Sequence, residues 1–510
     1  MTLALYPYQE TGVRFLRVAE SALLADEMGT GKTAQTIATL EADDLYPALI
    51  VCPNTVKFVW RREFAKWAPD REVVVASNGT VAANKDAQAV LDGEADVLVI
   101  NWEATKNLSR LAGYGSIHLA GCTDCDPNST RRPAQCEREN KVLNTIPWKV
   151  VIADEVHRAK SPKAKQTRAL WAVGDDADRR YALTGSPLTN SPADLWSVMR
   201  FVSPTEYPAK WPWLERYAKL QYNPFSQSPD VVGLREDRRD ELDRFLMPRF
   251  LRRTKAMVLP DLPPKTYERR DVVLTGKQKK AYDSLRDDCI AAIDGGMMST
   301  TSILTQALRL RQFAAAYGEL IVDPKDATQE MTFDDIGTEF DKLDAHVRLS
   351  EPSSKLDALE DVLLELGDQP VVVFADSRQL IDLAFARFVD KVPCAKITGP
   401  IATKEREVAV ENFQDGLVRI MFATVGAGGE GITLTAASTA VFLQRPWSLV
   451  QSKQAEDRLH RIGQDAENVL YIDLVTADTV EERVFEALME KGEMLEDLVR
   501  DKENLQRWLK

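Results

Sequence analysis

The sequence of 510 residues lacks any apolar run long enough to cross a membrane, because a membrane-spanning helix needs about 18 or more consecutive apolar residues. The opening residues Met-Thr-Leu-Ala-Leu are too few, and have no basic flank, for a secretory leader. We therefore expect a cytoplasmic protein without a membrane partner.

Cysteine is also scarce, with six in the whole chain, and this number in a long chain without a leader favours reduced thiols or a metal site over a disulfide framework. Positive charge is not in excess, since the formal net charge is -13. That balance argues against a general coat for nucleic acid but leaves room for a local basic groove. No sequence repeat and no nuclease or methyltransferase motif is visible.

The chain does contain two long segments with the pattern of an α/β fold. Short apolar runs separated by helical stretches predict buried parallel strands in residues 1–202 and again in residues 351–510. The expected strands are 21–25, 48–52, 73–76, 97–101, 149–153 and 180–184 in the first segment, and 370–375, 395–398, 419–423, 439–443 and 468–474 in the second. We expect two doubly wound parallel-sheet lobes with helical insertions between them.

The middle segment, residues 203–350, is richer in aromatics and charge and has few clear strands. We expect helical protrusions there, with a helix over 277–308. Residues 249–265 carry five basic side chains and one acidic one, and end in a proline-rich stretch. Two interpretations remain open for them: a linker stiffened by proline, or a basic brace that couples the lobes.

A glycine-rich turn, Asp26-Glu-Met-Gly-Thr-Gly-Lys-Thr33, follows the first apolar strand and precedes a helix. Glycines let backbone amides approach phosphate oxygens, and the start of a helix adds positive partial charge. We expect Asp26 and the run Gly29, Thr30, Gly31, Lys32 and Thr33 to bind ATP. In that site Lys32 would reach the β- and γ-phosphates and Thr33 would bind Mg²⁺. Asp26 stands where the strict phosphate-loop pattern has its first glycine. The alternative interpretation of residues 26–33 is a structural turn that binds no nucleotide.

An acidic pair, Asp154 and Glu155, follows the apolar strand 149–153. The carboxyl end of a parallel strand faces the ligand crevice of an open sheet. We expect Asp154 to hold Mg²⁺ and Glu155 to activate the attacking water; the alternative is a pair that caps a helix.

Two arginines near the C-terminus, Arg458 and Arg461, are three positions apart and would share one face of a helix. As arginine fingers they would stabilise charge on the transferring phosphoryl group and close the ATP site across two domains. The alternative is a solvated basic face. Gln9 is a candidate for reading the adenine edge, and an exposed structural glutamine is the competing interpretation.

These motifs, taken in order, resemble the Swi/Snf-type DNA translocases of helicase superfamily two. The resemblance rests on 6–9, 26–33, 52–53, 154–157, 183–188, 251–255, 354–357, 427–431 and 454–464. It implies two RecA-like lobes and ATP-driven tracking along duplex DNA. It also implies that residues 184–187 couple hydrolysis to lobe movement, and that Gly428, Gly429 and Gly431 line the cleft near DNA and ATP, with Gly431 at the nucleotide.

Some positions depart from the family pattern, namely Thr30, Val156, Glu430 and Thr433, and these departures concern coupling more than ATP binding. The short chain resembles a minimal bacterial or phage member more than a nucleosome remodeller. We expect a monomer whose partners are double-stranded DNA and DNA-bound proteins such as polymerase.

Half of the cysteines fall in one turn-rich stretch between the expected strands 97–101 and 149–153. His118, Cys122, Cys125 and Cys136 lie within 19 residues and include a C-x2-C step. Four nitrogen and sulfur ligands suit a closed tetrahedral zinc site, so we expect a structural zinc insertion at 115–140. A polar surface loop with incidental thiols is the alternative.

Three functions compete on this evidence. The leading hypothesis is an ATP-dependent translocase on duplex DNA that remodels or displaces bound factors. The others are a strand-separating DNA or RNA helicase on the same core, and a non-hydrolysing DNA-binding factor switched by ATP.

Overall fold

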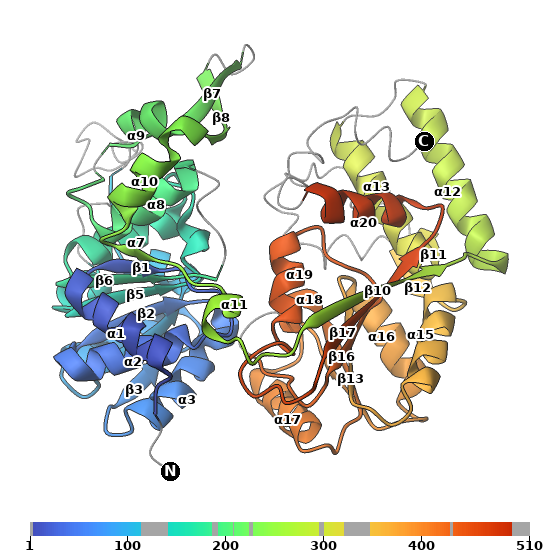
Figure 1. Ribbon diagram of the computed structural model, residues 1–510, viewed down its shortest axis with the longest axis horizontal. Helices are drawn as coiled ribbons and strands as arrows, with labels where there is room; N and C mark the ends of the chain where they lie inside the picture. Colours follow the sequence, from blue (N-terminus) through green and yellow to red (C-terminus); the bar gives the residue numbers. More distant parts are fainter. Residues whose placement is uncertain are drawn as a thin grey trace. The chain divides into compact units, whose positions relative to one another are not determined.

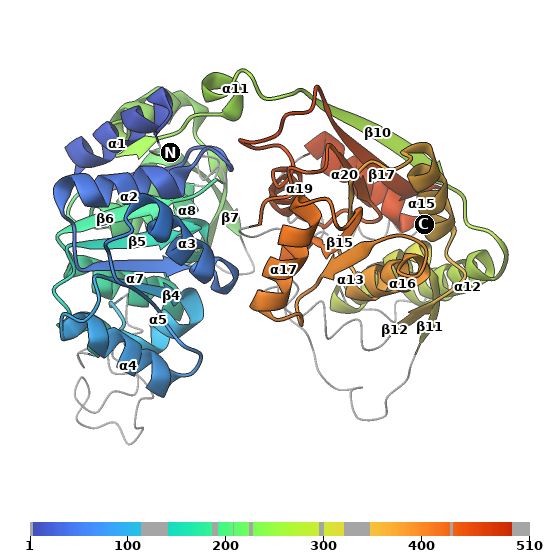
Figure 2. The same ribbon diagram turned by 90° about the horizontal axis from the view of Figure 1, so that it is seen from below.

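The computed structural model describes residues 4–113, 141–185, 192–207, 209–223, 228–294, 300–320, 347–428 and 432–491. The chain divides into two compact units, Met1–Pro260 and Asp261–Lys510, drawn from two sides in Figures 1 and 2. Each unit is built on its own parallel sheet. Residues 203–260 belong with the first unit and residues 261–350 with the second.

The first unit contains a seven-stranded sheet in which every pairing is parallel. Its order is β3 (Val73–Val75), β4 (Val97–Asn101), β2 (Ala48–Cys52), β5 (Val150–Asp154), β6 (Arg179–Leu183), β1 (Ala22–Leu24) and β9 (Phe250–Leu251). Most of the strands are apolar along nearly their whole length because helices cover both faces, as they do in doubly wound sheets; β6, which begins Arg179-Arg180, is the exception among them.

Alternation along each strand divides the apolar side chains of this unit between two cores. In β2, for example, Leu49 and Val51 join one core, whereas Ile50 and Cys52 join the other. The helices α1 (Pro7–Ala19), α2 (Lys32–Asp43) and α3 (Lys57–Trp67) contribute to the second core. The first core receives side chains from α4 (Thr80–Leu91), α5 (Trp102–Leu108), α6 (Val142–Thr145), α7 (Lys165–Asp175) and α8 (Pro192–Val202). Short 3-10 turns follow β2 and β5: η1 (Asn54–Val56) and η3 (Val156–Ala159).

The rest of the first unit is a small helical extension with a hairpin that projects from it in Figure 1. It comprises α9 (Lys210–Tyr217), the antiparallel pair β7 (Ala218–Asn223) and β8 (Ser228–Leu234), η4 (Glu236–Arg238) and α10 (Arg239–Leu246). The chain then returns to the sheet as β9 and continues into α11 (Lys255–Val258). This return places residues 249–255 directly beside β1.

The second unit contains a six-stranded parallel sheet. Its order is β10 (Lys265–Val272), β17 (Val469–Thr476), β16 (Thr439–Phe442), β13 (Val371–Ala375), β15 (Ile420–Thr424) and β14 (Cys394–Ile397). The helices are α12 (Gly276–Asp294), α13 (Thr300–Ala315), α15 (Ser354–Glu365), α16 (Arg378–Phe388), α17 (Thr403–Gln414), α18 (Val425–Gly428), α19 (Leu449–Glu456) and α20 (Val480–Lys491). A short antiparallel pair, β11 (Tyr317–Leu320) and β12 (Val347–Ser350), completes the unit.

The predicted fold class is confirmed: two parallel-sheet α/β lobes with helical insertions. The helix expected over 277–308 is in fact two helices, α12 and α13. Sequence analysis missed β9 and β10, both of which lie in or next to the stretch interpreted as a linker or brace. None of the helices in the described ranges is long and apolar enough to cross a membrane.

Candidate active site

The phosphate loop connects β1 to α2, as the sequence predicts. Gly29 and Gly31 adopt positive φ angles of 78° and 77°, a region that glycine enters without steric cost. A Cβ atom at Gly31 would lie 2.3 Å from the Nε2 atom of Gln9, so a larger residue would also displace the glutamine. The helix α2 begins at Lys32, and its first amides therefore face the loop where an anion can bind.

The side chain of Lys32 folds back onto this loop. Its ammonium donates to the carbonyl of Asp26 at 2.8 Å and to that of Glu27 at 3.2 Å. Both acceptors are neutral, so a phosphate oxygen placed nearby would attract the ammonium more strongly than they do. The lysine is thus held in the loop and is ready to exchange partners.

Three side chains converge on the carbonyl oxygen of Thr30. The Tyr8 hydroxyl donates to it at 2.9 Å, the Gln9 amide at 3.1 Å and the Gln35 amide at 3.4 Å. Gln9 is only 4% exposed, and its Oε1 accepts from the backbone amide of Tyr6 at 3.0 Å. In this arrangement Gln9 fixes the phosphate loop, and its reading of adenine stays a prediction.

Asp154 is the last residue of β5 and lies at the same edge of the sheet as the phosphate loop. Strand register pairs Leu24 with Leu183, and Leu183 with Asp154. Adjacent strands are about 4.8 Å apart, so the end of β1 and Asp154 are separated by about 10 Å. The predicted acidic residue and the predicted loop are therefore close enough to contact one bound nucleotide and its metal.

The carboxyl of Asp154 is held by two donors. Nε1 of Trp60, on α3, donates to Oδ2 at 2.9 Å, and the backbone amide of Glu155 donates to Oδ1 at 2.9 Å. Trp102 donates to the backbone carbonyl of Asp154 at 3.1 Å. Burial, followed by the charge of Glu155, raises the pKa of Asp154 to about 6. A bound divalent cation would favour the ionised form and lower that pKa again.

Glu155 has a left-handed backbone with φ of 51°, which costs a residue other than glycine about 1–3 kcal/mol. This conformation ends β5 and begins the 3-10 turn η3. The Glu155 carboxylate lies 3.2 Å from Nδ1 of His157. Strained residues of this kind concentrate at functional sites, and Glu155 is partly exposed where a water molecule can reach it.

Asp26 is fully buried, and its carboxylate forms an ion pair with Arg253. Trp60 and Arg253 are contacts of this site that sequence analysis missed. The motif 251–255 was recognised in the sequence as a family marker, but no spacing could show that it reaches the phosphate loop.

The two predicted arginine fingers lie close together in the second unit. The guanidinium groups of Arg458 and Arg461 both donate to the carbonyl of Ile432, at 3.3 Å and 3.2 Å. The expectation that they share one face of a helix is wrong, because α19 ends at Glu456 and both arginines follow it.

The chain at the end of α19 and just after it is bonded to other segments of the unit. The carbonyl of Glu456 accepts from the hydroxyl of Tyr471 at 2.8 Å, and that of Arg458 accepts from the amide of Leu434 at 2.9 Å. The backbone tightens into i to i-3 hydrogen bonds, such as that from Arg458 to Ala455. The arginines are therefore on a turn fixed to the sheet.

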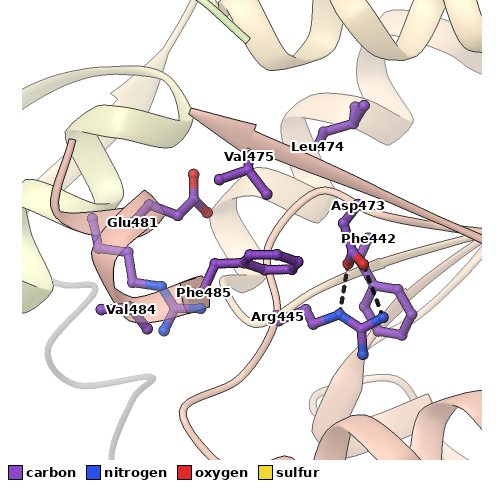
Figure 3. A pocket seen from close by; sticks show the side chains of 9 residues that line it. Phe442, Arg445, Asp473, Leu474, Val475, Glu481, Val484 and Phe485 are labelled. Carbon is purple, nitrogen blue, oxygen red and sulfur yellow. Dashed lines mark hydrogen bonds and ion pairs between the residues drawn. The ribbon is translucent and has the colours of Figure 1, made fainter. Parts of the chain in front are cut away.

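The same unit contains a buried network of charges, of which Figure 3 shows the pair between Arg445 and Asp473. Arg445 pairs with both carboxylate oxygens of Asp473, at 2.6 Å and 3.1 Å, and with Glu456 at 2.7 Å. Lys265, at the start of β10, lies 3.2 Å from both Glu456 and Asp457. Because bidentate arginine–carboxylate pairs fix geometry, this network holds the chain that leads into Arg458.

Several predicted residues lie outside the described residues. They are Gly429, Gly431, residues 186–187 of the coupling motif and the four proposed zinc ligands His118, Cys122, Cys125 and Cys136. Within the ranges that the structure does describe, no group of three or more histidine, cysteine or acidic side chains could hold a metal ion.

Comparison with known families gives two matches that together cover most of the chain. Residues 8–318 match the SNF2-related domain, and residues 354–463 match the helicase conserved C-terminal domain. The first match alone spans more than half of the sequence. It includes the phosphate loop, Asp154, Glu155 and Arg253, whereas the second includes Arg458 and Arg461.

The chain is also similar to curated proteins over nearly its full length. It is 26% identical over 531 residues to TATA-binding protein-associated factor mot1 of Aspergillus fumigatus, covering 94% of this chain and 26% of that protein. It is 28% identical over 500 residues to chromodomain-helicase-DNA-binding protein 1-like of Mus musculus, covering 95% and 49%. It is 29% identical over 518 residues to the CHD3-type chromatin-remodeling factor CHR7 of Arabidopsis thaliana, covering 99% and 38%. The chain thus spans about a quarter to a half of the length of these relatives.

Among solved structures, the Sulfolobus solfataricus SWI2/SNF2 ATPase core in complex with dsDNA aligns with a TM-score of 0.41 and 22% identity, covering 100% of this chain and 97% of that one. The family matches establish the relationship on their own. The chain belongs to the SNF2-related family of helicase superfamily two and forms a helicase-like ATPase core of the Swi/Snf type.

Proposed function

We propose that this protein is a DNA-dependent ATPase that tracks along double-stranded DNA and remodels or displaces factors bound to it. The observation that carries the proposal is the edge of the first sheet. There the phosphate loop after β1 and the pair Asp154–Glu155 at the end of β5 lie within reach of one nucleotide.

The residues at this edge suit MgATP. The glycine turn offers backbone amides to phosphate oxygens, and Lys32 supplies a cation that donates to the carbonyls of Asp26 and Glu27. Thr33 and Asp154 would hold Mg²⁺, which when bound neutralises charge on the phosphates. The raised pKa of Asp154 fits a site that is completed by a cation.

Hydrolysis then requires a base and a cationic partner. Glu155 lies next to the metal ligand and is partly exposed, so it can accept a proton from a water molecule in line with the γ-phosphate. We assign Arg461, with Arg458 beside it, to stabilise the charge that develops on the transferring group. The carbonyl of Ile432, an acceptor that both arginines share, is neutral, so a phosphate would attract them more strongly than this carbonyl does.

The choice of DNA as the track is supported by family membership and by the names of the relatives. The names of those reported are chromodomain-helicase-DNA-binding protein 1-like, a CHD3-type chromatin-remodeling factor and a TATA-binding protein-associated factor. The net charge of -13 implies that DNA contacts are local. We expect a limited set of phosphate contacts, hence weak sequence preference and an affinity that falls as salt rises.

The test is an ATPase assay with duplex DNA, single-stranded DNA and RNA as activators. Stimulation by duplex DNA above the other two supports the proposal. A strand-separating helicase would respond most to single strands or forks, and a non-hydrolysing switch would bind ATP without turnover under all three conditions.

We further propose, on sequence alone, a structural zinc ion held by His118, Cys122, Cys125 and Cys136. Four protein ligands would leave no open position for water. The ion would therefore act in folding of its own segment and take no part in hydrolysis.

A further inference from the structure

The segment 249–255 runs parallel to β1 and continues past its end. Backbone amides of Leu23, Ala25 and Glu27 donate in turn to the carbonyls of Arg249, Leu251 and Arg253, at 2.7, 2.7 and 2.9 Å. This ladder follows the chain out of the sheet and into the start of the phosphate loop. One further bond extends it, from the amide of Lys255 to the Glu27 carboxylate at 2.8 Å.

The side chain of Arg253 connects three separate parts of the nucleotide site. Its guanidinium pairs with both oxygens of the buried Asp26, one of them at 3.0 Å. It also donates to the carbonyl of Tyr8 at 2.5 Å and to Oε1 of Gln35 at 3.0 Å. The guanidinium lies over the ring of Tyr8, 5.5 Å from its centroid. One arginine thus joins α1, the phosphate loop and α2.

All three parts also meet at the carbonyl of Thr30, which accepts from Tyr8, Gln9 and Gln35. Arg253 therefore holds two of the three residues that fix this carbonyl, and through Asp26 it holds the residue whose carbonyl binds Lys32. Its side chain is 11% exposed and that of Asp26 is 0% exposed. Removing one partner would leave an uncompensated buried charge, which is strongly unfavourable.

We propose that Arg253 is a positioning residue of the nucleotide site: it fixes the phosphate loop and Tyr8 in the conformation that binds ATP. This inference rests on the proposed function, since it assumes that the loop binds ATP. Arg253 acts through Asp26, Tyr8 and Gln35. In this role the fully buried Asp26 carboxylate pairs with Arg253 and so holds the conformation of the phosphate loop. Lys255 and α11 follow Arg253 closely in the sequence, and the first unit ends at Pro260. ATP binding would therefore also reduce the motion of residues 255–260, where the chain leaves this unit.

The experiment measures equilibrium binding of a fluorescent ATP analogue, with Mg²⁺, to the full-length protein and its variants. We expect Arg253→Gln and Asp26→Asn each to weaken binding at least tenfold. The double variant should lose less affinity than the product of the two single-variant losses, because it leaves no buried charge without a partner. Arg253→Lys should bind with intermediate affinity, since a lysine cannot make the bidentate pair and the other two bonds together.

Arg249→Gln is the matched control. Arg249 lies on the same segment and pairs with Glu206 at 2.8 Å, away from the phosphate loop. The Arg249→Gln variant should bind the analogue with an affinity within about twofold of wild type, even if its Tm is lower. A second readout is hydrogen exchange of residues 249–259, which ATP should slow in wild type and in Arg249→Gln but not in Arg253→Gln.

The outcomes separate this inference from the proposed function. If the wild-type protein binds no ATP analogue, the proposed function fails and the inference falls with it. If wild type binds and Arg253→Gln binds equally well, only the inference is overturned; equal losses in Arg253→Gln and Arg249→Gln also overturn it, because they would show general destabilisation. Should Arg253→Gln not fold, Arg253→Lys and Asp26→Asn carry the same test.

Discussion

Replacing Asp154 by asparagine tests whether this carboxylate, the proposed Mg²⁺ ligand, is held in an environment that disfavours its charge. Asparagine removes the charge next to Glu155, but its single oxygen can keep only one of the two bonds that the carboxylate accepts, from Nε1 of Trp60 or from the amide of Glu155. In the absence of Mg²⁺ and nucleotide, we expect the stability of Asp154→Asn relative to wild type to rise between pH 5 and pH 8, and the variant to be inactive.

The magnitude follows from the pKa of Asp154, raised from 3.8 to about 6 by burial and by Glu155. Below about pH 3 the carboxyl is neutral in both the folded and unfolded states, so it costs nothing. As pH rises through 6 the folded protein must ionise a group that the unfolded chain ionises more easily. Each pKa unit corresponds to about 1.4 kcal/mol, so wild type loses about 3 kcal/mol by pH 8 and about half of that by pH 5.

The assay is thermal unfolding in a chelator at pH 5 and pH 8, with Asp70→Asn as an exposed control. The lost bond costs about the same at both pH values, so the difference between them isolates the charge. It amounts to about 1.5 kcal/mol, or about 3–6 °C in Tm for a domain of this size. We expect the Tm of Asp154→Asn relative to wild type to be higher at pH 8 than at pH 5 by that amount, and the Asp70→Asn control to show no such change. A relative stability that does not rise from pH 5 to pH 8 would refute the reasoning.

The remaining predictions concern hydrolysis and zinc. Glu155→Gln should lower kcat by about 10² to 10⁴ while ATP still binds; turnover at the wild-type rate would show that another group acts as base. Arg461→Ala should lower kcat by about 10³ or more, and Arg458→Ala by as much or less, which single-turnover kinetics can measure; full activity in Arg461→Ala would remove the finger assignment. Protein purified without a histidine tag should contain about one zinc per chain, lost on joint Cys122→Ser and Cys125→Ser substitution with ATP binding retained; metal analysis that finds no zinc in wild type would reject that site.

Most strands could be predicted from the sequence because buried parallel strands are continuous apolar runs. The runs 48–52 and 97–101 coincide with β2 and β4. The strand β10 was missed because its sequence, Lys-Thr-Tyr-Glu-Arg-Arg-Asp-Val, carries five charges. It lies at the edge of its sheet and exposes much of its surface, so its pairing with β17 depends on partners about 200 residues away.

The candidate site was only partly predictable for a related reason. Lys32, Asp154 and Glu155 belong to local patterns at the ends of apolar strands, and the sheet brings such ends to one edge. Trp60 and Arg253 contact that edge from 94 and 227 residues away in sequence, and no local spacing reveals those contacts. The turn that carries Arg458 was predicted as helix because no local pattern reveals its distant contacts. The amide of Leu434 bonds the carbonyl of Arg458, and the hydroxyl of Tyr471 bonds that of Glu456.

The central claim, movement along an intact duplex, is tested most directly by displacement of a third strand from a DNA triplex, run beside unwinding of a forked duplex. The account predicts ATP-dependent triplex displacement by wild type, none by Glu155→Gln, and no separation of the fork. Efficient unwinding of the fork without displacement of the third strand would contradict it and would identify a strand-separating helicase.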